Sequence, residues 1–428
     1  MGSEPIDRLW VLLAALLVFL MQVGFLCLEV GMVRQREAVV QALKNAIDWM
    51  MAVLAFFLVG FGLMFGPTLA GWLGSGLFAL EGLSEATGAD PGALCFFLFQ
   101  LGFVGTAVTI VSGALAGRVS FNAYLVASFV VAILIYPVFG HWVWGGSLLP
   151  GNAGWLGRMG YVDFAGSSVV HGVGGFVALA GAWFVGPRLG RFGPDGEPRP
   201  MAPSQLGLSV LGLLVLWVGW WGFNGGSTLR FDAASVGSIL LNTNLAGAAG
   251  GFAGFLHCWF LQGKRDLEEK LIGSTLGGLV AITASCHIVS PAAALAIGAL
   301  AGPIHNLAFD FLLRRLRIDD PVGAIPVHGV CGTWGVLAVA LFADASRLEH
   351  GRLMQLGVQA LGMLACFAWA GGSAYVLFRV LRASIGLRVS PDEERCGVNM
   401  AGEVHEPAAA ESIDPALLRE LMGLEQGS

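Results

Sequence analysis

Long apolar segments recur through the whole chain, and they constrain its fold more than any other feature. The 428 residues are 56% apolar and only 12% charged, whereas soluble domains carry about a quarter charged residues. A hydrocarbon core about 30 Å thick needs about 20 apolar residues per helix. We therefore expect an all-α membrane protein with about eleven transmembrane helices, near residues 8–32, 43–66, 95–116, 121–144, 165–186, 205–226, 235–262, 271–289, 291–312, 326–343 and 354–380.

The first apolar run resembles a secretory signal peptide at its start, because Arg8 precedes the apolar stretch from Leu9 to Cys27. Two features argue against that interpretation. The run is longer than the apolar region of a signal peptide, and no A-x-A cleavage site follows it before Arg34. We interpret it as the first membrane span.

Positive charge alternates between successive loops. One set of loops is basic, and in bacteria such loops face the cytoplasm; its residues are Arg34, Arg36, Lys44, Arg118, Arg188, Arg191, Arg199, Lys264, Arg265, Lys270, Arg314, Arg315 and Arg317. The other set carries only Arg158, Arg230, Arg347 and Arg352. This pattern predicts an inner-membrane protein with its N-terminus outside. It also predicts a membrane domain over residues 1–384 and a cytoplasmic tail over residues 385–428.

An internal repeat gives the strongest indication of architecture. The pattern Val-His-Gly-Val-x-Gly occurs at residues 170–175 and again at 327–332, and each copy follows an aspartate, Asp163 or Asp320, by eight residues to the histidine. The copies lie on the fifth and tenth predicted spans, so they cross the membrane in opposite directions. Such inverted repeats place a functional site near the midplane. We therefore expect two five-helix halves, related as an inverted repeat, plus a long eleventh helix.

The repeated histidines, His171 and His328, are the main candidate site. A histidine inside an apolar helix is costly unless it is paired or faces a water-filled cavity. A plain helix-to-helix hydrogen bond is one alternative, and a metal site is another, but the neighbouring residues offer no third ligand. Two adjacent imidazoles can share a proton and rest as a neutral hydrogen-bonded pair. Such a pair suits a small species that can lose or carry one proton.

Other polar residues receive a structural interpretation. Asp163 and Asp320 stand at helix starts, where a carboxylate caps free N–H groups and favours the helix dipole; Asp163 has a further possible role in shaping the entry for a cation. Glu29 is expected to pair with polar groups near the inner end of the first span, without a transport role. The remaining histidines are expected to be structural or solvated: His141, His257, His287, His305, His350 and His405.

Function classes other than transport find little support. The charge distribution does not favour nucleic acid as a partner. No nucleophile–base set, phosphate-binding loop or cofactor motif is present, so we expect no enzyme activity, no cofactor and no metal.

The sequence resembles the ammonium transporter family, the Amt/Mep/Rh proteins, over nearly its whole length. The most specific segments are Asp163-Phe164-Ala165-Gly166 before Val170-His171, Gly219-Trp220-Trp221-Gly222-Phe223-Asn224-Gly225-Gly226-Ser227, Asn242-Thr243-Asn244, and Asp319-Asp320-Pro321 before His328-Gly329-Val330-Cys331-Gly332.

The resemblance implies a homotrimer in which each subunit has its own narrow pore for ammonium and ammonia. It implies an outer recruitment site at Trp144, Phe103 and Ser227, a gate of two stacked phenylalanines at Phe103 and Phe223, and a dry segment lined by His171 and His328. In this mechanism ammonium is recruited, loses a proton and passes inward as ammonia.

Three departures from the family pattern concern regulation and packing. Gly117 stands where many members have glutamate, Trp221 replaces a common phenylalanine, and the tail differs from residue 394 onward. The tail ends in an expected short amphipathic helix over residues 413–422, with an Asp cap and a Pro in the first turn. These features keep an alternative open, a non-conducting or weakly conducting ammonium sensor. The expected partner of the tail is a cytoplasmic PII-type signalling protein or a fused signalling module.

Overall fold

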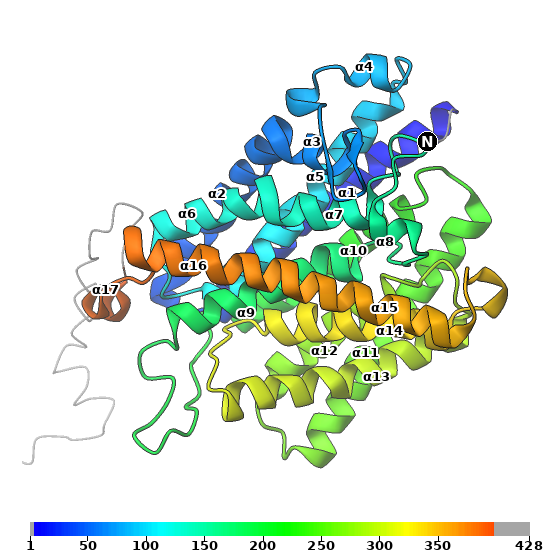
Figure 1. Cartoon of the computed structure of the whole chain (residues 1–428). Coiled ribbons are helices and arrows are strands. Elements are labelled where there is room, and N and C mark those ends of the chain that lie inside the picture. The colour runs from blue at the N-terminus through cyan, green and yellow to red at the C-terminus, as the bar shows by residue number, and fades with distance from the viewer. Residues whose placement is uncertain (1–3, 398–428) are drawn as a thin grey trace, which may run out of the picture.

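The computed structural model describes residues 4–397 and is a bundle of long helices that lie roughly along one axis (Figure 1). The first five spans are α1 Pro5–Met32; α2 Ala38–Ala55 with η2 Phe56–Gly60 and α3 Phe61–Phe65; α5 Gly92–Leu115; α6 Phe121–Val130 with η4 Val131–Ile135 and α7 Tyr136–Trp144; and η5 Ser167–Gly172 with α9 Val173–Val185.

The second half repeats this pattern and adds one helix. Its spans are α10 Leu206–Gly226; α11 Ala233–Leu261; α12 Leu267–Ile282; α13 Pro291–Asp310 with η6 Phe311–Arg315; and η7 Ile325–Val330 with α14 Cys331–Phe342. The additional helix is α15 Arg352–Cys366, continued by η9 Phe367–Gly371 and α16 Gly372–Ser384. It lies diagonally across the outside of the bundle (Figure 1).

The predicted fold class is confirmed. Among residues 4–397, ten helices are long and apolar enough to cross a membrane. The eighth predicted span is the exception, because α12 has 16 residues and ends at Ile282, where residues 271–289 were expected. At 1.5 Å per residue it is about 24 Å long. Residues 283–288 continue as turns, so an apolar run alone overestimated the length of this helix.

Short elements connect the spans. They are η1 Gln35–Glu37, the hairpin strands β1 Thr68–Leu69 and β2 Leu73–Gly74, η3 Phe78–Leu80, α4 Leu83–Ala86, α8 Trp155–Arg158, η8 Ala345–Arg347 and, after the last span, α17 Pro391–Cys396. The amphipathic helix predicted at 413–422 lies outside the described residues.

The two halves meet through small residues. At the contact of α1 with α10, a Cβ on Gly24 would lie 2.9 Å from the backbone nitrogen of Leu216, and a Cβ on Gly212 would lie 2.5 Å from that of Leu28. Glycine lets helix backbones approach this closely where lipid supplies no hydrophobic drive. Helices α9 and α14 run toward opposite ends of the bundle (Figure 1), as the inverted repeat predicts.

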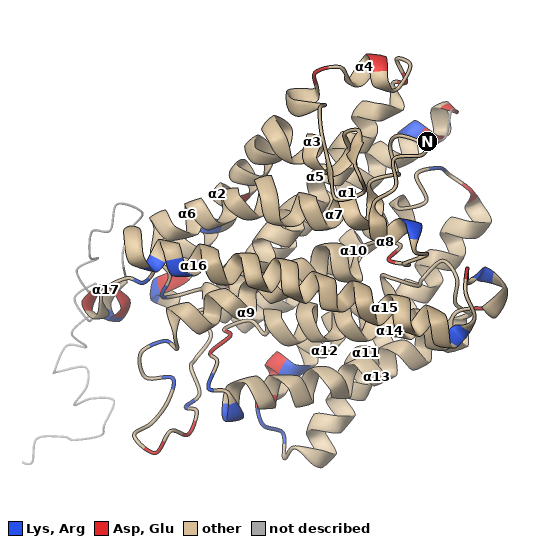
Figure 2. Cartoon of the chain, in the orientation of Figure 1, with Lys and Arg blue, Asp and Glu red and all other residues tan. Residues whose placement is uncertain are grey.

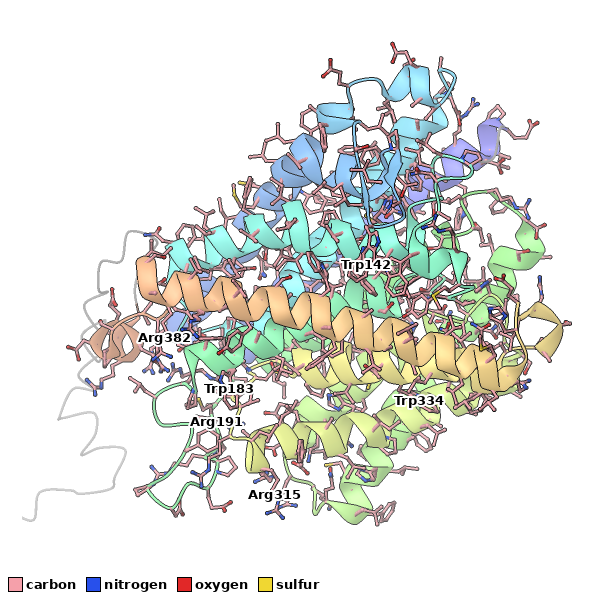
Figure 3. The ribbon with its side chains drawn as sticks, in the orientation of Figure 1. Trp142, Trp183, Arg191, Arg315, Trp334 and Arg382 are labelled. Carbon is pink, nitrogen blue, oxygen red and sulfur yellow. The ribbon has the colours of Figure 1, made fainter. Side chains whose placement is uncertain are left out.

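Charge separates along the axis of the bundle. The basic loops lie at the end that carries α17, and loops with fewer Lys and Arg lie at the N-terminal end (Figure 2). Arg191, Arg315 and Arg382 all lie toward the α17 end, whereas Trp142 and Trp334 lie toward the other end (Figure 3). Between them the helices carry few charged side chains (Figure 2), as a membrane-embedded region requires.

Candidate functional site

The two repeated histidines meet in the interior of the bundle. Nδ1 of His171 lies 3.0 Å from Nδ1 of His328, and the ring centroids are 5.1 Å apart with an interplanar angle of 19°. His171 is fully buried and His328 is 4% exposed. At this distance one nitrogen donates a hydrogen bond and the other accepts it. The two side chains that the sequence repeat singled out, 157 residues apart in the chain, are therefore in contact.

Both histidines lie on π-helical turns that begin their spans. His171 lies on η5 and His328 on η7, and each turn continues as an ordinary α-helix, α9 or α14. The amide of His171 donates to the carbonyl of Gly166, five residues earlier, at 3.0 Å. Gly166 has a φ of +111°, a conformation that favours glycine. Turns of this kind recur at functional sites.

Asp163 caps the start of η5, as predicted. Its carboxylate accepts hydrogen bonds from the amides of Gly166, Ser167, Ser168 and Val169, and from the hydroxyl of Ser168. Burial raises the pKa of Asp163, and these hydrogen bonds oppose the rise. Asp320 caps η7 more simply, accepting from the amide of Ile325 at 2.7 Å. The two aspartates therefore fix the turns that carry the histidines.

Two phenylalanines cover the histidine pair on its outer side. The rings of Phe103 and Phe223 stack with centroids 4.0 Å apart and an interplanar angle of 13°, and neither is more than 1% exposed. The ring of Phe223 lies 5.5 Å from that of His171. The stack leaves no gap between the rings, so the residues expected to form a gate lie in contact.

The aromatic series continues outward to Trp144. Its ring centroid lies 5.9 Å from that of Phe103, and its indole N–H donates to the carbonyl oxygen of Asp163 at 2.7 Å. The hydroxyl of Ser227 donates to the carbonyl of Phe223 at 2.8 Å, at the end of α10. Trp144, Phe103 and Ser227 are thus linked through the phenylalanine stack.

An outer cavity of about 500 Å³ reaches Ser227. Its other lining residues include Phe164 and His287, whose rings stack at 4.0 Å, and the arginines Arg230 and Arg347. Trp144 and Phe103 do not line it.

Trp220 is a site residue to which the sequence analysis gave no role. Its ring stacks on His171 at 5.4 Å with an interplanar angle of 18°, and its indole N–H donates to the hydroxyl of Thr283 at 3.0 Å. Trp220 lies in the segment from Gly219 to Ser227, but neither spacing nor composition separates it from its neighbour Trp221, which is 41% exposed.

The end of the bundle that carries α17 is held by a charged cluster around Asp319. Its carboxylate accepts from Arg188 Nε at 2.7 Å and pairs with Arg191 at 3.3 Å, while Arg118 donates to its backbone carbonyl at 2.6 Å. Burial alone would raise the pKa of Asp319, but the three arginines outweigh it and hold the pKa well below its usual range. This cluster ties three loops together.

A different acidic side chain lies beside Gly117, the position where many members of the resembled family have glutamate. Gly117 has a φ of +80°, and a Cβ there would lie 2.7 Å from a carboxylate oxygen of Glu37. Glu37 is buried and paired with Arg34. The carboxylate of Glu37, which comes from η1, thus lies close to where a side chain at position 117 would be.

Several of the other polar residues have hydrogen-bond partners within the protein, as predicted, whereas His405 lies outside the described residues. His141 bonds to the hydroxyl of Thr68 and the carbonyl of Met64, and His305 lies beside Asn306. Glu29 accepts hydrogen bonds from Gln41, Asn45 and Ser112. Within residues 4–397, no three His, Cys, Asp or Glu side chains gather closely enough to hold a metal ion.

Comparison with known proteins places the chain in a family. The model of the Ammonium Transporter Family matches residues 9–406. Ammonium transporter Amt2 of Archaeoglobus fulgidus is 42% identical over 93% of this chain and 87% of its own length. Ammonium transporter 1 member 3 of Solanum lycopersicum is 34% identical over 93% and 92% of the two chains.

Solved structures show the same relationship. A protein described as a sensor Amt protein superposes with a TM-score of 0.88 and 42% identity, over 91% of this chain and 96% of the other. Mep2 of Candida albicans superposes with a TM-score of 0.79 and 28% identity, over 91% and 87%. The chain is a multi-pass membrane protein that belongs to the ammonium transporter family.

Proposed function

We propose that this protein moves ammonium across the membrane as ammonia, through a pore that passes Trp144, Phe103, Phe223, His171 and His328 in that order. The observation that carries the proposal is the buried histidine pair, 3.0 Å apart and directly beneath two stacked phenylalanines. A small molecule that passes the rings next meets the imidazole of His171 and then that of His328.

Recruitment at the outer end follows from the chemistry of Trp144, Phe103 and Ser227. An aromatic face attracts a small cation by cation–π interaction, and a hydroxyl oxygen accepts one of its N–H groups. The cation is costly to bury beyond this point, whereas neutral ammonia is far less so. Ammonium can lose a proton at the gate and potassium cannot, which supports selective transport.

The assembly and placement of the protein form part of the same proposal. The charge pattern of the loops supports an inner-membrane protein with its N-terminus outside and residues 385–428 in the cytoplasm. The family relationship supports a homotrimer with a pore in each subunit, no enzyme activity, and a PII-type protein or fused signalling module as the partner of the tail.

A sensor is the second candidate. The observation that favours it is the 42% identity to a solved protein described as a sensor Amt protein, over 96% of that chain. In this alternative the pore binds ammonium but conducts little or none, and the tail relays occupancy.

Currents on solid-supported membranes separate the two candidates. Proteoliposomes that contain the purified protein are given pulses of ammonium and, as a control, of potassium. A transporter gives an ammonium-specific current or an ammonia-driven change of internal pH. Ammonium binding without either signal would exclude transport and favour the sensor.

A further inference from the structure

A cavity of about 220 Å³ lies at the end of the bundle that carries α17, where basic and acidic residues both gather (Figure 2). A water molecule needs about 10–15 Å³ of such space, so the cavity has room for a group of several heavy atoms. The start of α2, the start of α6 and α17 all border it, and none of the residues proposed for the pore lines it. The cavity is therefore separate from the path of ammonium.

Two basic side chains at this cavity lack acceptors. Lys44 on α2 is 5% exposed, and its Nζ donates to the carbonyl of Val119 at 2.8 Å. Among residues 4–397 the ammonium group makes no other hydrogen bond and no ion pair. An ammonium has three N–H donors, and a buried charge without partners is costly. Arg36, which is exposed, likewise makes no side-chain hydrogen bond or ion pair within the described residues.

The first turn of α6 supplies further donors. Ser120 is the N-cap residue, and its hydroxyl accepts a hydrogen bond from the amide of Ala123. The next two residues, Phe121 and Asn122, line the cavity, and their amides make no hydrogen bond in the part of the chain that the structure describes. Such N–H groups begin every α-helix and, together with the helix dipole, favour an anion.

The acidic side chains at the cavity are already bonded to other groups. Glu37 pairs with Arg34, and Glu394 pairs with Arg34 and Arg388. Glu393 lies in the first turn of α17 and takes part in its capping box, where the helix dipole favours a negative charge. The two basic side chains without acceptors therefore keep their charge for a ligand.

We propose that this cavity binds a phosphate group, carried by a soluble phosphorylated compound or by an anionic lipid headgroup. The phosphate oxygens accept hydrogen bonds from Lys44, from Arg36 and from the first amides of α6. A phosphate monoester offers three strong acceptor oxygens, which suits donors that come from several directions better than a carboxylate does. A bound phosphate links α2 to α6. The site does not rest on the proposed function.

Inorganic phosphate is the test ligand. It is titrated by calorimetry into the full chain in phosphatidylcholine nanodiscs, with chloride holding the ionic strength constant, and the wild type should bind it saturably. Lys44→Met keeps an apolar stem but removes the charge, so phosphate should bind at least about tenfold more weakly, because a charged hydrogen bond is lost. Arg395→Gln is the control, since Arg395 is an exposed basic residue on α17 that does not line the cavity. Its affinity should equal that of the wild type.

A second pair of variants tests the amide donors and serves also when Lys44→Met does not fold. Phe121→Pro removes the N–H at the first helical position, where proline is tolerated. Ser120 before it already has the extended ψ of 145° that a following proline favours. Phe121→Ala removes the same ring but keeps the N–H. Phosphate should bind at least about fivefold more weakly to Phe121→Pro than to Phe121→Ala.

Native mass spectrometry of nanodiscs that contain phosphatidylglycerol distinguishes the two sources of the phosphate group. A headgroup ligand is retained by the wild type and by Arg395→Gln but not by Lys44→Met. A soluble ligand gives the calorimetric signal without retained lipid. A wild type that shows neither signal, or equal phosphate affinities for wild type, Lys44→Met and Phe121→Pro, overturns the site. Neither measurement uses ammonium currents, so failure of the transport proposal leaves the phosphate site intact.

Discussion

Gly175 lies against Gly329 so closely that a Cβ on Gly175 would be 2.3 Å from the amide nitrogen of Gly329. The contact is reciprocal, because a Cβ on Gly332, the matching glycine of the second repeat, would lie 2.4 Å from the carbonyl oxygen of Ser167. Gly175 lies on α9 and Gly332 on α14, so these glycines let each π-helical turn pack in backbone contact with the α-helix that follows the other turn. The crossing places His171 and His328 within hydrogen-bonding distance.

Gly175→Ala is therefore expected to push α9 away from η7. A methyl group forced into a packed contact costs about 1–3 kcal/mol, which lowers the midpoint of thermal unfolding and weakens ammonium currents. Gly237→Ala is the control, since Gly237 lies in α11 with no neighbouring atom within 4 Å of an added Cβ. The control should match or exceed the wild-type midpoint. Equal midpoints and currents for all three proteins would contradict the close crossing.

His171→Ala is expected to abolish or alter conduction. It removes the fully buried imidazole between Phe223 and His328 and leaves a cavity beside a His328 that has lost its hydrogen-bond partner. Solid-supported membrane currents with ammonium and potassium pulses measure the change. His350→Ala alters a histidine in the loop between α14 and α15 that contacts the carbonyl of Met159, and its currents should equal those of the wild type. Unchanged flux and selectivity in His171→Ala would exclude a pore-lining role.

Asp319→Asn is expected to destabilise the protein strongly at neutral pH. Loss of one partner from a buried charge cluster costs about 3–5 kcal/mol. The folded-state pKa of Asp319 is depressed, so its stabilising contribution is complete above the unfolded pKa of about 3.9 and is lost as pH falls toward the lower folded pKa. The difference in unfolding midpoint between wild type and variant should thus be constant from pH 7 to 5 and shrink below about pH 4.

The control for Asp319 is Asp392→Asn. Asp392 pairs with Arg395 on α17, and both side chains are more than half exposed, so the change should have little effect at any pH. If the difference in unfolding midpoint between Asp319→Asn and wild type stayed constant down to about pH 3, the prediction would be wrong. The stabilising contribution of Asp319 would then not depend on the ionisation of its carboxylate beside the arginines.

Cys396 reports on the orientation of the protein. Its side chain is partly exposed on α17 at the basic end of the bundle. A membrane-impermeant maleimide should label Cys396 in inside-out vesicles but not in spheroplasts. Cys396→Ser removes the label, and Ser346→Cys on η8 should give the opposite pattern. Labelling of Cys396 in spheroplasts would reverse the topology.

Sequence reasoning was most successful where a pattern occurred twice. The histidine pair and its aspartate caps follow from two copies with equal offsets, because helices of an inverted repeat meet on a common axis. The contacts of Trp144, Phe103 and Phe223 came from the family resemblance instead. No periodicity in the chain predicts that Phe103 on α5 stacks on Phe223 on α10.

Features that depend on the approach of three helices could not be predicted. Glu29, Gln41 and Ser112 come from α1, α2 and α5, and only their packing shows that Gln41 and Ser112 donate to the same oxygen of Glu29. The stacking of Trp220 on His171 depends in the same way on the rotation of α10. The end of α12 was missed because the apolar run continues through turns that are buried by neighbouring helices.

The short length of α12 also affects how membrane voltage acts on the pore. From Ile272 onward the helix is buried, so its missing length faces protein rather than lipid. After it ends, His287 lines the cavity of about 500 Å³, which also reaches Ser227 at the end of α10. Voltage falls mainly where water is excluded, and each elementary charge experiences about 2.3 kcal/mol per 100 mV across the whole drop. For the proposed pore we therefore expect a stronger field between Phe103 and His328 than along the cavity.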